Sequence, residues 1–398
     1  MKRSKTDILI IGAGMAGLSL AGLLAQSGFT VTVVDREHPD VLASESHDGR
    51  TVALSMGTRD VLAPLGIWDT ILPHAAAITE IDVQEGHDPF LLNFTSDAVG
   101  AEAFGWIFPN SVVRKALYEK ARGLGVVFMQ GALWDIKFPS SPAQAGERIT
   151  ALLQAGGEIS AALLVGADGR FSRVRDLCGI NGVNLSYRQT ALVGLVEHEL
   201  PHQGLAVERF YPTGPFAVLP FTTIKNMHRS AIVWTLDDKN PGPDKADHAA
   251  ITAGLAPLFD ARYGKIKAVG KWASYPLSLF HAKEMTAPRV ALISDAAHAI
   301  HPIAGQGLNL GMRDVAVLAG LLAHARAMEA DIGGTELLEE YGRARRFDVF
   351  AMVAATDILN RLFGNKMRSI RWLRSAGLGV VNRLPPLKRF FVQTAMGR

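Results

Sequence analysis

The sequence is poor in cysteine, in net charge and in long apolar segments. Its single cysteine, Cys178, excludes an internal disulfide and is typical of a reducing compartment. The 41 basic residues nearly balance the 38 acidic ones, and the net charge of +3 gives no reason to expect a nucleic-acid partner. An apolar run from Ile8 to Leu24 follows three basic residues, but its glycines and the strand pattern after it argue against a signal peptide. No other run is long enough to span a bilayer.

The composition indicates a soluble globular protein with a large core. Hydrophobic residues make up 48% of the chain and charged residues 20%. A length of 398 residues is enough for two or three domains.

A glycine-rich turn lies between two predicted strands near the N-terminus. The pattern predicts a strand over Asp7–Ile11, a helix to about Gln26 and a second strand over Phe29–Val34. The first strand leads into Gly12-Ala-Gly-Met-Ala-Gly17, and Asp35 follows the second strand. This is the β-α-β fingerprint of dinucleotide binding in its proper context.

Each glycine of that fingerprint has a physical role. Gly12 permits the tight turn, Gly14 lets a pyrophosphate approach the backbone, and Gly17 lets helix and strand pack closely. Asp35 is placed to bind a pair of ribose hydroxyls.

A second strand, loop and helix arrangement lies in the C-terminal third. A strand over Val290–Ile293 is followed by Asp295, by a loop with Pro302, Gly305 and Gly307, and by a helix from Leu308. Such a helix start presents backbone N–H groups and a positive dipole end to an anionic group.

Two further segments carry candidate ligands. Gly166-Ala-Asp-Gly-Arg-Phe-Ser-Arg-Val-Arg175 follows a strand over Leu163–Val165, and its Asp168 is either a ligand or a loop-capping acid. Arg50 is either a ligand for a phosphate or ring edge, or a surface arginine. Helices are also predicted over Gly57–Leu65 and Asn110–Leu124.

The middle of the chain predicts a second, antiparallel sheet that could form the wall of a pocket. A hairpin over Ile78–Thr95 is its first part. Its other strands are predicted over Ala191–His198, Ala206–Tyr211, Phe216–Phe221, Ser230–Leu236 and Ile266–Tyr275, with a helix over His248–Phe259.

Three separated segments that return to one sheet edge suggest a long ligand, FAD rather than NAD. They are similar to three motifs of the FAD-dependent aromatic hydroxylases of para-hydroxybenzoate hydroxylase type. The motifs are Gly12–Gly17, Gly166–Arg175 and the segment from Ser294 to Asp314. The last most resembles the ubiquinone-biosynthesis hydroxylases, apart from Ser294, where the family usually has glycine.

This resemblance implies an α/β fold with a Rossmann-like, mainly parallel FAD-binding domain, an inserted antiparallel-sheet substrate domain and C-terminal helices. We expect residues 1–70, 106–184 and 284–330 to form the FAD-binding domain. Residues 71–105 and 185–283 would form the substrate domain, and 331–398 the helical region.

The resemblance also assigns residues to the cofactor and substrate. The flavin environment would include Pro302, Gly305, Gln306 and Gly307, with no side-chain acid or base. Leu219 and Pro220 would line the substrate pocket. No metal site is expected, although His298 and His301 are close in sequence. FAD would contact Gly12, Gly14, Met15, Ala16, Gly17, Asp35, Arg36, Arg50, Arg114, Asp168, Asp295, Gly307, Leu308 and Asn309.

The reaction implied is hydroxylation of the ring of a polyprenylated phenol in ubiquinone biosynthesis. The family reduces FAD with NADPH or through a separate reductase, and O₂ then forms a flavin C4a-hydroperoxide that transfers oxygen to the ring. The alternatives are hydroxylation of another aromatic compound, or a non-catalytic FAD-binding subunit of a lipid-biosynthesis complex. A halogenase would carry a Trp-x-Trp-x-Ile-Pro element, which Trp106-Ile-Phe-Pro109 does not match.

The C-terminal tail is basic and aromatic. From Arg361 onward it has nine Lys or Arg and no Asp or Glu. We expect it to bind an anionic membrane surface or a partner subunit of a ubiquinone-biosynthesis complex. The expected location is cytoplasmic, on the inner face of the membrane.

Overall fold

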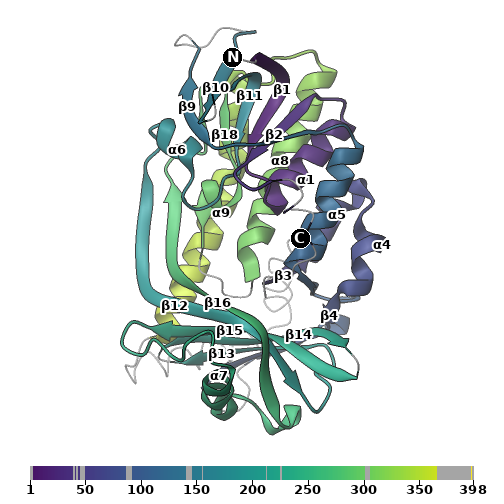
Figure 1. The fold of residues 1–398 in the computed structure, drawn as a ribbon, viewed down its shortest axis with the longest axis vertical. Coiled ribbons are helices and arrows are strands. Elements are labelled where there is room, and N and C mark those ends of the chain that lie inside the picture. Colours follow the sequence, from purple (N-terminus) through teal and green to yellow (C-terminus); the bar gives the residue numbers. More distant parts are fainter. Residues whose placement is uncertain are drawn as a thin grey trace.

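The computed structural model describes residues 3–38, 41, 44, 50–86, 92–139, 146–154, 156–211, 213–224, 226–300, 305–364 and 396. Two eight-stranded sheets, joined by a three-stranded one, dominate these residues (Figure 1). The α-helices are α1 (Met15–Gln26), α3 (Met56–Leu62), α4 (Trp68–Ile71), α5 (Asn110–Gly123), α6 (Arg173–Leu177), α7 (His248–Leu255), α8 (Gln306–Ala327) and α9 (Thr335–Gly364). No helix within the described ranges is both long and apolar enough to cross a membrane.

The first sheet has a parallel centre, as the sequence predicted. Its path is β17-β18-β11-β1-β2-β8, in which β18, β11, β1, β2 and β8 are mutually parallel. Its strands are β1 (Arg3–Ile11), β2 (Val31–Asp35), β8 (Val127–Gln130), β9 (Leu133–Lys137), β10 (Ile149–Leu153), β11 (Glu158–Gly166), β17 (Thr286–Ala287) and β18 (Val290–Leu292). The antiparallel strands β9 and β17 were not predicted.

Almost continuous apolar residues explain why these strands are central. Ile8 to Ile10 and Leu163 to Val165 are fully buried, because α1, α8 and other elements cover both faces of the sheet. The carboxyl ends of the parallel strands point toward the second sheet (Figure 1). Ligands of open parallel sheets bind at this edge.

The second sheet is antiparallel except at one pair. Its order is β19-β16-β12-β15-β14-β13-β5-β6. Its strands are β5 (Glu80–Glu85), β6 (Leu92–Thr95), β12 (Gly182–His198), β13 (Leu205–Tyr211), β14 (Gly214–Ile224), β15 (Met227–Asp237), β16 (Ile266–Ala282) and β19 (His298–Ala299). The β5–β6 hairpin confirms the prediction, but β5 joins β13 in parallel. No tight turn links these two strands, so their direction is not constrained to be antiparallel.

A small sheet not predicted from the sequence lies between the two large ones. It has the order β3-β7-β4, formed by β3 (Thr51–Ser55), β7 (Gly105–Pro109) and β4 (Ala76–Ile78). Both β4 and β7 contact β14 of the second sheet. The helix α9 packs on α8 and also reaches β13 and β14, so it makes a second connection between the sheets (Figure 1).

A buried carboxylate fixes the turn after β18. Asp314 of α8 is fully buried and accepts hydrogen bonds from the Ser294 backbone N–H at 2.8 Å, from His298 Nε2 at 2.6 Å and from Arg345 Nε of α9 at 2.6 Å. Burial alone would raise the pKa of the Asp314 carboxyl, but His298 and Arg345 hold it below its ordinary value. We call these four residues the Asp314 network.

The same turn requires a backbone conformation at position 294 that suits glycine. Ser294 has φ 54°, a left-handed conformation that glycine adopts without strain. A Cβ added to Gly311 of α8 would lie 2.4 Å from Ser294 Oγ. The serine side chain therefore occupies the space that a side chain at position 311 would need.

This contact predicts a coupled effect on stability. We expect Gly311→Ala to lower the free energy of unfolding by about 1–3 kcal/mol through overpacking, and to lose most of this cost in a Ser294→Gly background. Gly320→Ala is the matched control: its added Cβ has no heavy atom within 4 Å, so higher helix propensity should raise stability by up to about 1 kcal/mol. Urea unfolding followed by circular dichroism measures all four variants. Equal costs for Gly311→Ala in both backgrounds would contradict the predicted contact.

Candidate cofactor-binding site

The glycines of the first turn divide into two kinds. Gly12 has φ 110°, and a Cβ there would lie 2.3 Å from the Ala167 carbonyl oxygen. A Cβ on Gly17 would lie 2.2 Å from the Gly12 oxygen. Packing within the chain thus explains these two glycines. Gly14, at the start of α1, would place its Cβ in open space. This opening at a helix N-terminus has the position and polarity that suit a pyrophosphate.

Two charged side chains flank this opening. Asp35 accepts hydrogen bonds from the Ala13 backbone N–H at 2.6 Å and from the Glu37 N–H at 2.9 Å, so its carboxylate is fixed beside the glycine turn. Arg114 of α5 lies 3.7 Å from Glu37, and its buried Nε has no hydrogen-bond partner among the described residues. An orphaned guanidinium N–H is a ready donor for an acceptor on a ligand.

Asp168 and Asp295 follow neighbouring parallel strands but differ in what they bind. Asp168 accepts hydrogen bonds from Ser172 Oγ at 2.5 Å and from the N–H groups of Arg173 and Val174. Its carboxylate therefore caps α6, although burial raises its pKa. Asp295 has no hydrogen-bond partner among the described residues and is solvent-exposed.

The Asp295 carboxyl is exposed to solvent, although protein surrounds it. Desolvation by the surrounding protein raises the pKa of its carboxyl, and the charges of His298 and Arg170 act in the opposite direction. Asp295 is thus available to a ligand, while the backbone behind it is held by the Asp314 network.

The start of α8 also has one glycine that packing requires and one that it does not. Gly305 has φ 63°, and its added Cβ would lie 3.0 Å from Ala53 Cβ, so packing against β3 explains it. Among the described residues, a Cβ added to Gly307 would meet only Ile300 Cγ1, at 4.0 Å. Asn309 ties this helix start to β3, because its Oδ1 accepts from the Ser55 N–H at 3.0 Å and its Nδ2 donates to the Ala53 oxygen at 3.0 Å.

The other predicted site residues have varied positions. Met15, Ala16, Gln306 and Leu308 lie in the first turns of α1 and α8. Arg36 and Arg50 are exposed, after β2 and before β3 respectively. Pro302 and His301 lie outside the described residues.

The two predicted substrate residues are adjacent on β14 and lie on opposite faces of the sheet. Leu219 packs with the core shared with the first sheet. Phe216 and Val218 pack in the core beneath α7, and strand alternation places Pro220 on their side. Only Leu219 therefore lies on the face toward the glycine turns.

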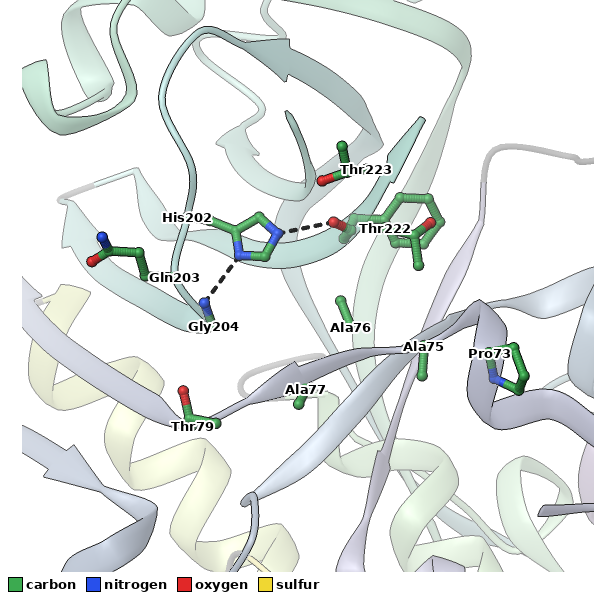
Figure 2. Close-up of a pocket in the computed structure, with 11 residues that line it drawn as sticks. Pro73, Ala75, Ala76, Ala77, Thr79, His202, Gln203, Gly204, Thr222 and Thr223 are labelled. Carbon is green, nitrogen blue, oxygen red and sulfur yellow. Dashed lines mark hydrogen bonds between the residues drawn. The ribbon is translucent and has the colours of Figure 1, made fainter. Parts of the chain in front are cut away.

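A pocket of about 530 Å³ lies elsewhere, between the small sheet and the end of β14 (Figure 2). Its lining is Pro73, Ala75, Ala76, Ala77, Thr79, His202, Gln203, Gly204, Phe221, Thr222 and Thr223. His202 Nδ1 accepts from the Gly204 N–H at 3.0 Å, so Nε2 carries the proton and donates to the Phe221 oxygen at 2.9 Å. Burial lowers the pKa of His202. With this neutral histidine and no charged side chain, the pocket is not matched to a pyrophosphate.

The arrangement as a whole fits FAD. The N-termini of α1 and α8 face the carboxyl edge of the first sheet. Each has a glycine, Gly14 or Gly307, that contacts with the described residues do not require. The Arg114 Nε and the Asp295 carboxylate, which have no hydrogen-bond partner in the described ranges, supply one donor and one acceptor. Within the described part of the chain, no three His, Cys, Asp or Glu side chains converge as a metal site would need. Sequence reasoning missed the Asp314 network, which no local pattern signals.

Comparison with known proteins agrees with this geometry. The family model described as "FAD binding domain" matches residues 5–356. Ubiquinone hydroxylase UbiL of Rhodospirillum rubrum is 39% identical over 98% of this chain and 89% of its own length. The 3-demethoxyubiquinol 3-hydroxylase of Escherichia coli is 30% identical over the full length of both chains.

Solved structures show the same fold. The p-nitrophenol 4-monooxygenase PnpA of Pseudomonas putida superposes with a TM-score of 0.80 at 19% identity, covering 100% of this chain and 99% of its own. The full-length family match and the two relatives at 30% identity or more establish the relationship. The chain belongs to the FAD-binding aromatic hydroxylases, in the group of the ubiquinone hydroxylases.

Proposed function

We propose that this protein is an FAD-dependent monooxygenase that hydroxylates the aromatic ring of a polyprenylated phenol in ubiquinone biosynthesis. The observation that carries the proposal is the end-to-end relationship to a ubiquinone hydroxylase and a demethoxyubiquinol hydroxylase. The open glycines at α1 and α8 support it, because they provide room for a long, anionic cofactor between two helix N-termini.

In this proposal the ADP half of FAD lies at the first turn. The N–H groups at the start of α1 and the Arg114 guanidinium face the pyrophosphate, and Asp35 faces the ribose. Asp168 shapes this end of the site by capping α6. Asp295 faces the ribityl hydroxyls. When bound, FAD would supply the electrons that activate O₂, and one atom of that O₂ would be added to the ring while the other leaves as water.

The protein contributes electrostatics, orientation and exclusion of water. The positive end of the α8 dipole lies at Gly307, where it would stabilise negative charge on a reduced flavin ring. The substrate ring would lie between this helix start and the face of the second sheet that carries Leu219. Electrons would come from NADPH or from a separate reductase.

A glycine substitution tests the flavin assignment. We expect Gly307→Leu to fold normally but to lower FAD affinity at least about tenfold, because its side chain enters the space assigned to the ring. Gly320→Leu makes the same change on an exposed face of the same helix and should retain FAD. The flavin-to-protein ratio after gel filtration and the thermal midpoint are measured for both. Full FAD occupancy and unchanged flavin reduction in Gly307→Leu would refute the assignment.

Quinone profiling tests the function itself. Deletion of the gene should cause an under-hydroxylated polyprenyl phenol to accumulate and ubiquinone to fall, because one ring oxygen is no longer introduced. The structure of the accumulated compound identifies the ring position. A normal ubiquinone pool without such an intermediate would refute the proposal. Purified flavoprotein that shows no phenol-stimulated O₂ consumption with NADPH or a chemical reductant would instead favour a non-catalytic subunit.

We also propose that the basic tail brings the enzyme to the membrane that dissolves its substrate. Residues 365–395 lie outside the described structure, so this proposal depends on their charge. Truncation of residues 365–398 should abolish sedimentation with anionic liposomes while neutral liposomes bind neither form. Unchanged sedimentation with anionic liposomes would show that the tail does not bind the membrane. It would then favour a partner subunit as the ligand of the tail.

A further inference from the structure

Glu208 is a carboxyl group in the middle of the second sheet that has no partner within the described part of the chain. It lies on β13, an interior strand between β14 and β5. Its cross-strand neighbours are Ala217 and Val83, both unable to form a side-chain hydrogen bond. Among the described residues it has no hydrogen bond or ion pair, and its side chain is only partly buried.

The strand alternation gives the direction of this carboxyl. Val207 packs in the core beneath α7. Arg209 lies on the same side, where it donates to the Leu258 oxygen and pairs with Asp260. Glu208 therefore points to the opposite face, together with Ala206, which packs in the core shared with the first sheet. This is the face that also carries Leu219, and α9 contacts β13 and β14 from the same side.

The carboxyl is unfavourable for the protein without ligand. Desolvation raises the pKa of Glu208 from its ordinary value to about 8, and within the described ranges no neighbouring charge or hydrogen bond opposes this effect. A partly buried polar group that finds no partner in the chain lowers stability. Such a group on the wall of a binding site is expected where a ligand supplies the missing hydrogen bond.

We propose that Glu208 binds the hydroxyl group of the phenol substrate and thereby determines which edge of the ring faces the cofactor. This inference rests on the proposed function. A phenol hydroxyl both donates and accepts, so it can pair with a carboxyl in either protonation state. Leu219, which is half-buried on the same face of the neighbouring strand, suits the face of a ring. A site built in this way rejects an analogue whose hydroxyl is blocked, because its polar group stays unpaired.

The test compares a phenol with its blocked analogue. FAD-loaded protein is titrated with a 2-prenylphenol and with the corresponding methyl ether, and binding is followed by the change in flavin absorbance. We expect the wild-type protein to bind the phenol about 10- to 100-fold more tightly than the ether, as a hydrogen bond to a charged or strongly polar group implies. This measurement does not depend on turnover.

Three variants make the comparison specific. Glu208→Leu should abolish the preference for the phenol while the thermal midpoint stays equal or rises, because an unpaired carboxyl is removed. Glu208→Gln should keep most of the preference, since an amide still forms the hydrogen bond. Glu197→Leu is the matched control: Glu197 is partly buried in the same sheet, but its charge faces Arg229, so the preference should remain.

The outcomes separate this inference from the function on which it depends. Retained preference for the phenol in Glu208→Leu would overturn the role of Glu208. The same conclusion follows if the wild-type protein hydroxylates the phenol without preferring it to the ether. A wild-type protein that neither binds nor hydroxylates the phenol would overturn the proposed function, and this inference with it.

Discussion

The buried carboxylate of Asp314 is the interaction on which the cofactor side of the structure depends. It joins α8, the turn after β18 and α9, three elements that are separate in the sequence. Its three donors compensate the loss of hydration, which explains how a fully buried acid keeps a low pKa. Removal of the carboxylate would leave the buried Arg345 without this hydrogen bond. It would also remove the acceptor that holds the Ser294 backbone N–H, directly before Asp295. The network is thus the support behind the site, while Asp295 itself remains free for a ligand.

Glycine has two different uses in this fold, and only the structure distinguishes them. Gly12, Gly17 and Gly305 are required by contacts or backbone angles within the chain. Gly14 and Gly307 are not, and each lies at the start of a helix that points to the carboxyl edge of the parallel sheet. Motif spacing identified all five positions, but it could not separate glycines that allow the chain to pack from glycines that leave room for a cofactor.

Local patterns predicted most elements, whereas long-range partners remained hidden. The N-terminal fingerprint, the β5–β6 hairpin and the helix over Asn110–Gly123 follow from periodicity and turn residues, and all are present. The small sheet and the Asp314 network were missed because their parts are distant in sequence. Asn309 and Ser55, for example, are 254 residues apart. No window of sequence contains both, so the contact becomes visible only after the fold has brought α8 to β3.

Three carboxyl groups show how partners distinguish structural acids from ligand-binding ones. The Asp168 carboxylate accepts hydrogen bonds from the N–H groups at the start of α6. Its removal would therefore lower the stability of the chain directly. Asp295 and Glu208 have no such partner among the residues that the structure describes, and desolvation raises the pKa of both. Asp295 lies in the turn after β18 of the first sheet, and Glu208 lies on β13 of the second sheet. Each of these two carboxyl groups lowers the stability of the protein without ligand. A ligand hydroxyl that forms a hydrogen bond with the carboxyl would remove that cost. The ribityl chain of the cofactor would supply a hydroxyl group to Asp295, and the phenol would supply one to Glu208. These hydrogen bonds would offset the desolvation cost that each carboxyl carries in the protein without ligand.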